Sequence, residues 1–329
     1  MEEIINPDLT GIATEEFWVP SDTPGIELYV RHKYLAKNSS QANKGSVLFV
    51  HGSSYPSEVS FDLRVGGFSW MDYIALQGWS VFMMDLRGYG KSSRPPEMEE
   101  PAQQNLPVVR TETAVRDVNA VVENIVARTK QDRLSLIGWS WGSTVMAAYT
   151  CAHASRVNRL VLYAPQWLRT TPSLLGGNDI LGAYRYIPIS TTKDRWLNGV
   201  APGQREALIP AGWYETWVEA TLASDPAGCV LDCPGIRAPN GIIQDSREFW
   251  SNGKVIYNPA EITVPVLVIG GEWDADTPQY MAQGVFEHLT QAPAKRRVVI
   301  GEGTHTLLLE KHRMQLLKEV QLFLDETAF

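Results

Sequence analysis

One serine lies between two tryptophans and two glycines in the stretch GWSWG, residues 138–142. A serine hydroxyl becomes an effective nucleophile only where a neighbouring base takes its proton and a substrate carbonyl can reach it. A sharp turn from a strand into a helix exposes the hydroxyl, and the flanking glycines relieve the crowding of that turn. The pattern therefore predicts that Ser140 is the nucleophile of an acyl-transfer reaction. The alternative is a tight turn in which Gly138 and Gly142 only permit close packing.

A hydrolytic serine also needs hydrogen-bond donors for the negative charge that develops on the carbonyl oxygen. The N–H of Trp141 begins the predicted helix after Ser140, where N–H groups are free and the helix dipole is positive. An earlier apolar run ends in HGSS, residues 51–54, and Gly52 lets the N–H of Ser53 point at the same oxygen. We expect Ser53 and Trp141 to form the oxyanion hole and His51 to be architectural. An ordinary strand-ending turn is the alternative.

An acidic residue must orient the base, and VLVIGGEWDADTP, residues 266–278, has three carboxylates directly after an apolar run. Ligand-binding loops of α/β sheets gather at this end of the strands. Among the three we favour Asp274 over Glu272, because the turn leaves Asp274 at the top of the loop. Asp276 precedes Thr277 and Pro278 and is expected to cap the next helix instead.

The base is expected downstream of the acid, and His305 lies in the glycine-rich stretch GEGTH, residues 301–305. This stretch follows the last apolar run of the chain. Ser140, Asp274 and His305 thus form the predicted catalytic triad. Apart from His51, the other histidines lie in a predicted strand, on predicted helices or just after one, where solvated or packed roles suit them. These are His32, His153, His288 and His312.

Bringing these residues together requires a particular order of elements. Short, uniformly apolar runs bounded by turn residues are typical of strands buried on both faces of a parallel sheet. Helical spacing over 111–129 and after Ser140 completes an alternation that indicates an α/β fold, with a mostly parallel sheet flanked by helices. Residues 26–35 alternate apolar with polar and predict an antiparallel edge strand. The apolar runs are 46–52, 80–85, 134–140, 159–165, 264–271 and 296–301.

The alternation is interrupted from residue 166 to residue 259, a stretch with prolines, glycines and many aromatic residues. At roughly ninety residues, this stretch is too long for a loop within a compact domain. We therefore predict a mainly helical insertion that forms a cap over one end of the sheet. The predicted core then comprises residues 1–165 and 260–329, and the predicted cap domain comprises residues 166–259.

In its order of nucleophile, acid and histidine, the chain resembles the α/β-hydrolase superfamily over nearly its full length. The motifs that carry the resemblance are HGSS, DLRGYGKSS (85–93), GWSWG, GEWD and GTH. The resemblance implies the α/β-hydrolase fold, with a cap domain between the sixth and seventh strands. It also implies that His305 deprotonates Ser140, that Asp274 orients His305, and that the N–H groups of Ser53 and Trp141 stabilise the oxyanion. An acyl-enzyme on Ser140 is then hydrolysed by water, with no cofactor and no metal.

The residue types at the nucleophile and around it show which members of this superfamily the chain resembles. Haloalkane dehalogenases and epoxide hydrolases use an aspartate where this chain has Ser140. The stretch GWSWGSTVMAAY is similar to the elbow of the proline iminopeptidases, and WYETWVEATLASDP (213–226) resembles their cap. That resemblance implies that Glu215 and Glu219 grip a free α-amino group. The oxyanion loop departs from it, because HGSSYP stands where those enzymes have His-Gly-Gly-Pro-Gly, so an aminopeptidase or amidase is the alternative to an esterase.

Tryptophans flank the serine and recur in the insertion. Half or more are expected to form the insertion's own core, and those that face the site favour esters or lactones with an aromatic or alkyl portion. Eight basic and nine acidic residues over 166–259 indicate no ionic substrate. A non-catalytic ligand-binding protein is the third alternative. The expected substrate contacts are Trp139, Trp167, Trp213, Trp217, Glu215 and Glu219.

Composition argues against other classes of protein. The chain has 329 residues and a formal net charge of −8, which is unlike the clustered basic residues of nucleic-acid binders. The start MEEIINPDLTG does not resemble a secretory signal, and no stretch approaches the roughly 20 apolar residues that span a bilayer. We expect a cytoplasmic enzyme for a small molecule, without nucleic-acid or membrane partners, and leave open a homo-oligomer. Cys151, Cys229 and Cys233 are expected to be free thiols, with a local disulfide between the last two as the alternative.

Overall fold

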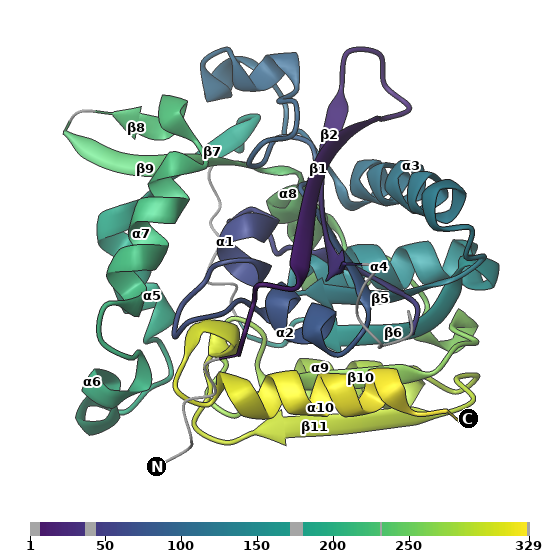
Figure 1. Ribbon diagram of the computed structural model, residues 1–329. Helices are drawn as coiled ribbons and strands as arrows, with labels where there is room; N and C mark the ends of the chain where they lie inside the picture. The colour runs from purple at the N-terminus through teal and green to yellow at the C-terminus, as the bar shows by residue number, and fades with distance from the viewer. Residues whose placement is uncertain (1–6, 37–43, 172–179, 231, 328–329) are drawn as a thin grey trace.

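A central sheet of eight strands forms the core of the computed structural model, which describes residues 7–36, 44–171, 180–230 and 232–327 (Figure 1). The strands are β1 (Ile12–Pro20), β2 (Glu27–Leu35), β3 (Ser46–Val50), β4 (Ser80–Met84), β5 (Leu134–Trp139), β6 (Val157–Tyr163), β10 (Val266–Gly271) and β11 (Lys295–Ile300). Their order across the sheet is β1-β2-β4-β3-β5-β6-β10-β11. The pairs β1-β2 and β2-β4 are antiparallel, and all other neighbours are parallel. The predicted mostly parallel α/β sheet is confirmed.

Each of the six apolar runs overlaps one of the parallel-paired strands. Five of these strands are almost fully buried and apolar, as expected for strands covered on both faces, whereas β11 lies at the second edge and is only partly buried. The antiparallel strand predicted over 26–35 is also present as β2, but its predicted edge position is wrong. β2 lies between β4 and β1, and β1 forms the edge. Strand β1 is largely exposed and carries Glu15 and Glu16, so it lacks the apolar signal by which the interior strands were recognised.

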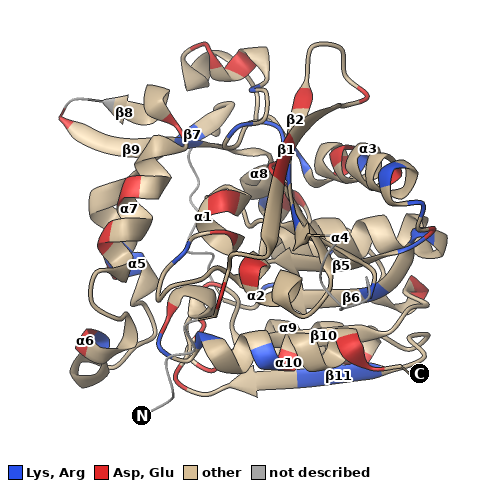
Figure 2. Cartoon of the chain, viewed as in Figure 1, with Lys and Arg blue, Asp and Glu red and all other residues tan. Residues whose placement is uncertain are grey.

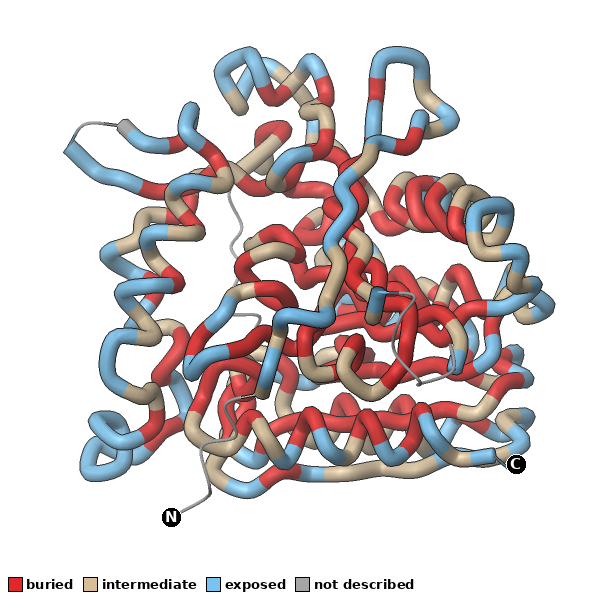
Figure 3. The backbone as a smooth tube through the Cα atoms, in the orientation of Figure 1, coloured by how far each residue is buried: buried red, intermediate tan, exposed pale blue. Residues whose placement is uncertain are grey.

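Helices cover both faces of the sheet. Alternate residues of β3 show the division, since Leu48 and Val50 belong to one core cluster and Val47 and Phe49 belong to the other. The first cluster includes side chains of α3, α4 and α9, and the second includes side chains of α1, α2 and α10. In Figure 3 the inner strands are mostly red, which marks buried residues, whereas the edge strands β1 and β11 are largely tan or pale blue. These helices are α1 (Ser57–Phe61), α2 (Trp70–Leu76), α3 (Thr111–Thr129), α4 (Trp141–Ala152), α9 (Gln279–His288) and α10 (Arg313–Asp325).

Residues 166–259 lie between β6 and β10, which are the sixth and seventh strands of the central sheet in chain order. In Figure 1 most of this insertion, drawn in green, lies beside the central sheet. It contains the helices α5 (Thr192–Trp196), α6 (Arg205–Leu208), α7 (Trp213–Ala223) and α8 (Gly241–Glu248). It also contains a small antiparallel sheet in the order β7-β9-β8, with β7 (Tyr184–Pro188), β8 (Cys229–Val230) and β9 (Cys233–Pro239).

The sequence did not predict this second sheet. Strand β9 reads CPGIRAP, and proline and glycine are depleted in strands. Cys229 at the start of β8 and Cys233 at the start of β9 are free, as is Cys151, in agreement with the predicted free thiols. That residues 166–259 form a separate cap domain stays a prediction at this point.

A buried cluster of charges fastens α1 and α2 to the antiparallel side of the sheet. Lys33 of β2 donates to Asp62 at 2.5 Å and to Asp72 at 2.7 Å, and Arg31 donates to Asp62 at 2.8 Å. Burial alone would raise the pKa of Asp72, but hydrogen bonds from Arg64 and Lys33 lower that pKa to about 2. Since both carboxylates are almost fully buried, each needs its cationic partners to remain charged.

Replacing the central ammonium group of this cluster should destabilise the fold. For Lys33→Met we expect the free energy of unfolding to fall by about 3–5 kcal/mol, because removing one partner leaves buried charge uncompensated. The measurement is urea unfolding followed by circular dichroism.

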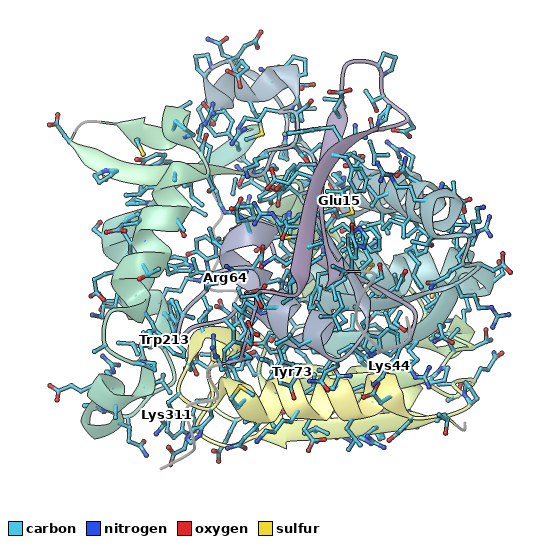
Figure 4. The ribbon with its side chains drawn as sticks, viewed as in Figure 1. Glu15, Lys44, Arg64, Tyr73, Trp213 and Lys311 are labelled. Carbon is cyan, nitrogen blue, oxygen red and sulfur yellow. The ribbon has the colours of Figure 1, made fainter. Side chains whose placement is uncertain are left out.

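Lys44 is the matched control, since its pair with Asp325 is partly exposed and lies beside α10 (Figure 4). For Lys44→Met we expect a loss of about 0–1 kcal/mol. Equal losses in the two variants would show that the buried cluster has no special role.

Candidate active site

Ser140 lies in the turn between β5 and α4 with φ 57° and ψ −118°. A positive φ is uncommon for a residue with a side chain and costs roughly 1–3 kcal/mol. The turn is held in place by a hydrogen bond of 2.8 Å from the N–H of Ser140 to the carbonyl of Tyr163 on β6. A strained residue held by its surroundings at the end of a buried strand is typical of a presented nucleophile.

The two glycines of the GWSWG stretch are required by close backbone approaches. A Cβ at Gly138 would lie 2.3 Å from the carbonyl oxygen of Gly142, and a Cβ at Gly142 would lie 2.3 Å from the carbonyl oxygen of Val50. Neither glycine has a positive φ, so space rather than dihedral angle excludes a side chain. The packing role of the glycines and the position of Ser140, which is buried but lines a pocket, are therefore two aspects of the same turn.

The loop after β3 lies directly against Ser140, since a Cβ on Gly52 would be 3.2 Å from the Cβ of Ser140. His51 holds this loop. Its Nε2 accepts the N–H of Leu86 at 3.1 Å, so its Nδ1 carries the proton that is donated to the carbonyl of Gly52 at 2.7 Å. Burial lowers the pKa of His51 to about 4. A neutral imidazole with both nitrogens bonded is an architectural element, as the sequence indicated.

The backbone of Ser53 is fixed through its carbonyl oxygen, which accepts bonds from the Tyr89 hydroxyl at 2.9 Å and from Arg185 at 2.6 Å. Within the described part of the chain, the N–H of Ser53 donates to no backbone or side-chain acceptor. The N–H of Trp141 opens α4 and has no partner within the helix. Among the described residues, the N–H groups of Ser53 and Trp141 are thus left without a backbone or side-chain acceptor.

The loops after β10 and β11 bring Asp274 and His305 together, with His305 Nδ1 at 2.8 Å from Asp274 Oδ2. The Asp274 carboxylate also accepts the N–H and the hydroxyl of Thr277, each at 2.8 Å. The His305 carbonyl accepts the Trp139 indole N–H at 3.0 Å and the Tyr163 hydroxyl at 3.0 Å. Both side chains are therefore held in position by their neighbours.

Burial alone would lower the pKa of His305. The Asp274 carboxylate outweighs burial through its charge and hydrogen bond, and with a further contribution from Asp276 the pKa is raised above its usual value. With Nδ1 bonded to Asp274, Nε2 is the nitrogen left to exchange a proton with another group.

Ser140 and His305 line one pocket with a cavity volume of about 40 Å³. This inner pocket is walled by residues of the core and of the insertion. The other lining residues are Gly52, Ser53, Ser54, Tyr55, Val59, Ser60, Trp139, Thr192, Arg195, Trp196, Trp217, Asp276, Thr306 and Leu309. Of the predicted substrate contacts, Trp139 and Trp217 are among them.

The remaining predicted contacts do not line this pocket, and their contact with a substrate stays a prediction. Glu215 and Glu219 are exposed, because residues two positions before and after Trp217 point away from the helix face that it buries. Figure 2 shows the acidic positions along α7. Trp167 is buried against Tyr257 and α9.

Trp213 lies at the start of α7 (Figure 4), where its ring covers the Arg313 guanidinium. These contacts place Trp213 outside the inner pocket.

Asp276 is the residue whose predicted role is most clearly wrong. It was expected to cap α9, but that helix begins after Pro278 with no side-chain cap, and Asp276 faces the inner pocket instead. There it pairs with Arg195 of α5 at 3.1 Å. Arg195 and Tyr55 were not predicted either. Arg195 could have been suspected as a charged residue beside Trp196 in an aromatic segment, and Tyr55 as the residue that follows HGSS.

Among the described residues, no three His, Cys, Asp or Glu side chains lie together so that they could hold a metal ion. Among the described helices, none has both the length and the apolar character needed to cross a membrane.

Comparison with known proteins places this geometry in context. A family model of the alpha/beta hydrolase fold matches residues 45–312. A probable proline iminopeptidase of Leptolyngbya boryana is 25% identical over 303 residues, which cover 84% of this chain and 86% of that protein.

Two solved structures are similar in fold. A bromoperoxidase from Bacillus anthracis has a TM-score of 0.62 and 17% identity, covering 95% of this chain and 100% of its own. A thermophilic esterase from Thermogutta terrifontis has a TM-score of 0.57 and 16% identity, covering 94% and 98%. At these identities the structures support the fold and leave the substrate open.

The close approach at Gly142 can be tested by adding one methyl group. For Gly142→Ala we expect the free energy of unfolding to fall by about 1–3 kcal/mol, since the Cβ must displace the strand end at Val50. Thermal unfolding measures this loss. Gly203 is the matched control, because a Cβ there has nothing within 4 Å. If Gly142→Ala were as stable as Gly203→Ala, the contact would not constrain the turn.

Proposed function

Because the chain belongs to the alpha/beta hydrolase fold family, we propose that it is a serine hydrolase that forms an acyl-enzyme on Ser140. Its proposed substrate is a small, largely apolar carboxylic ester or lactone. The observation that carries the proposal is the 2.8 Å bond between His305 and Asp274 at a pocket that His305 shares with the strained Ser140. Three side chains from distant parts of the sequence thus supply a base, its orienting acid and a nucleophile.

In the proposed acylation step, His305 Nε2 takes the proton of Ser140 while Oγ attacks the substrate carbonyl carbon. The carbonyl oxygen becomes an oxyanion, and the N–H groups of Ser53 and Trp141 stabilise it. Loss of one such donor costs about 10²–10³ in turnover. Asp274 keeps the proton on Nδ1 and stabilises the imidazolium that forms. Collapse of the intermediate breaks the ester bond, and the leaving alkoxide takes the proton from His305.

Deacylation repeats these steps with water as the nucleophile. His305 deprotonates the water, the water oxygen attacks the acyl carbonyl, and Ser140 leaves as a hydroxyl with the returned proton. No further group has to be oxidised, reduced or bound for this cycle to close.

The proposed substrate class follows from the walls of the inner pocket. Trp139, Trp196, Trp217, Val59 and Leu309 provide apolar surface, which suits the hydrocarbon portion of an ester or lactone. Two of these tryptophans belong to the insertion, which supports its proposed role as a cap domain over residues 166–259. A lid built from aromatic side chains also keeps water away from the oxyanion, which strengthens its hydrogen bonds.

An aminopeptidase or amidase remains the second candidate, favoured by the likeness to a probable proline iminopeptidase. The carboxylates expected to hold a free amino group, Glu215 and Glu219, are exposed on α7. Asp276, the acidic side chain among the described lining residues, is already paired with Arg195. The release of 4-nitroaniline from prolyl and alanyl 4-nitroanilides would favour this candidate.

The proposed nucleophile can be tested with 4-nitrophenyl acyl esters. For Ser140→Ala we expect kcat to fall by about 10⁴–10⁶-fold, and for Asp274→Asn by about 10⁴-fold, because the base then loses its orienting charge. Circular dichroism should show both variants folded. Turnover by the wild type that survives in Ser140→Ala would contradict the proposal. A complete lack of turnover would favour a non-catalytic ligand-binding protein.

The pH dependence of kcat/KM should report the charges around His305. The base must be neutral, so its raised pKa makes activity fall as the pH decreases through that value. In Asp276→Asn a charge that raises this pKa is lost, while the charge of Arg195, which lowers it, remains. We therefore expect the acid limb of the profile to move to lower pH. Glu302→Gln, which removes an exposed carboxylate paired with Lys311, should leave the limb in place. A shift to higher pH in Asp276→Asn would contradict this account.

A further inference from the structure

The inner pocket adjoins a larger chamber. With about 40 Å³, the inner pocket has room for only a few water molecules, since one water needs about 10–15 Å³ of such space. The neighbouring outer chamber has a volume of about 480 Å³ and lies between β7, α5 and the loop after β3. Tyr55, Thr192 and Arg195 line both spaces. A substrate at Ser140 that is too large for the inner pocket therefore extends into this chamber past these three side chains.

Two of these junction residues have unused hydrogen-bond donors. The described hydrogen bond of the Arg195 side chain runs from Nη2 to Asp276 Oδ1 at 3.1 Å, which leaves Nε and Nη1 without a partner among the described residues. The Tyr55 hydroxyl likewise has no hydrogen-bond partner in the described structure. Neither side chain is among the fully buried polar groups without a partner, and both residues line the two cavities.

Thr192, the third junction residue, has no unused donor, because its hydroxyl is bonded to Ile189 and Tyr214. The junction therefore offers several donors and few free acceptors. A ligand group placed here should be an acceptor.

The charged groups near the junction also favour a ligand group that accepts hydrogen bonds and carries negative charge. Behind Arg195 lies Arg185, whose Nη atoms hold the carbonyls of Pro239 and Ser53, and Arg169 donates to the backbone carbonyl of Asp276 at 2.8 Å. Arg195 and Arg169 thus contact Asp276, and Arg185 lines the outer chamber together with Arg195. Asp194 also lines the outer chamber, but it is exposed. An anionic group at the junction would balance the positive excess.

We propose that Arg195, with the Tyr55 hydroxyl, binds a carboxylate of the substrate at the junction of the inner pocket and the outer chamber. A carboxylate fits because the planar guanidinium fork matches a planar acceptor with two oxygens. This inference rests on the proposed serine hydrolase activity and narrows its substrate class to esters or lactones that carry a carboxylate beyond the scissile carbonyl. Arg195 then determines specificity while Ser140, Asp274 and His305 perform the chemistry.

The test compares matched pairs of esters that differ only in charge. The acyl-side pair is the 4-nitrophenyl monoester of glutaric acid and the corresponding ester of its terminal amide. The leaving-group pair is 4-acetoxybenzoate and 4-acetoxybenzamide. The readout is the ratio of kcat/KM for the anionic and neutral member of each pair, because a general loss of activity cancels in that ratio.

In at least one pair we expect the wild type to prefer the anion, and Arg195→Met to reduce the ratio by about 10–100-fold, as for loss of a charge-assisted bond. Asp276→Asn frees Arg195 from its partner and should increase the ratio. Arg205→Met, an exposed arginine on α6 outside both linings, should leave it unchanged. Ratios that stay the same in Arg195→Met and Asp276→Asn for both pairs would overturn the inference and make the ion pair a structural contact only.

A binding measurement separates this inference from the proposed activity. Calorimetry with monomethyl glutarate and with 4-acetoxybenzoate should show at least one of them binding Ser140→Ala at least 10-fold more tightly than Ser140→Ala/Arg195→Met. That result with no turnover by the wild type would refute the hydrolase and keep the carboxylate site. Turnover that depends on Ser140, together with equal binding of both ligands by the two variants, would refute the carboxylate site and keep the hydrolase.

Discussion

The positive φ of Ser140 is the constraint on which the rest of the site depends. A residue with a side chain takes this conformation at a cost of roughly 1–3 kcal/mol, so the neighbouring elements must hold it. Strand β6 does so through the bond from Ser140 to Tyr163, and β3 does so by closing on Gly142 to the limit of atomic contact. The same closure brings the loop after β3 against Ser140. The two free N–H groups beside the serine are therefore a consequence of how the strained turn is packed.

Much of this core could be predicted from the sequence because its signals are local. A strand buried on both faces must be apolar throughout, and the elbow at Ser140 needs glycines at fixed spacing, so both leave a mark in a few consecutive residues. The partnership of Asp274 with His305 was predictable from chain order, since parallel strands place their following loops at one edge of the sheet. Strand β1 left no such mark because an exposed edge strand does not have to be apolar.

The insertion was less predictable, for physical reasons that particular residues illustrate. Trp167, Trp213 and Trp217 look alike in sequence, but only Trp217 lines the inner pocket, and the packing of α7 and α9 decides that difference. Glu215 and Glu219 fail as pocket residues because one turn of a helix places them on the solvent side. The summed charge of the insertion was also a poor guide to its local charge. Residues 166–259 are almost neutral in total, yet two of their arginines, Arg169 and Arg195, contact one acidic residue of the core, Asp276.

The insertion therefore contacts the loops of the proposed triad through charged groups as well as through apolar surface. Arg195 of α5 pairs with Asp276, two residues from the acid that orients His305. The indole of Trp196 donates at 2.8 Å to the buried Glu310, whose other oxygen holds the N–H of Thr304 beside the base. Burial raises the pKa of Glu310 to about 7, so this side chain gains or loses its charge near neutral pH. Neighbouring residues of one short helix thus contact both loops of the proposed triad, and any movement of α5 that admits a substrate must also change the electrostatic surroundings of His305.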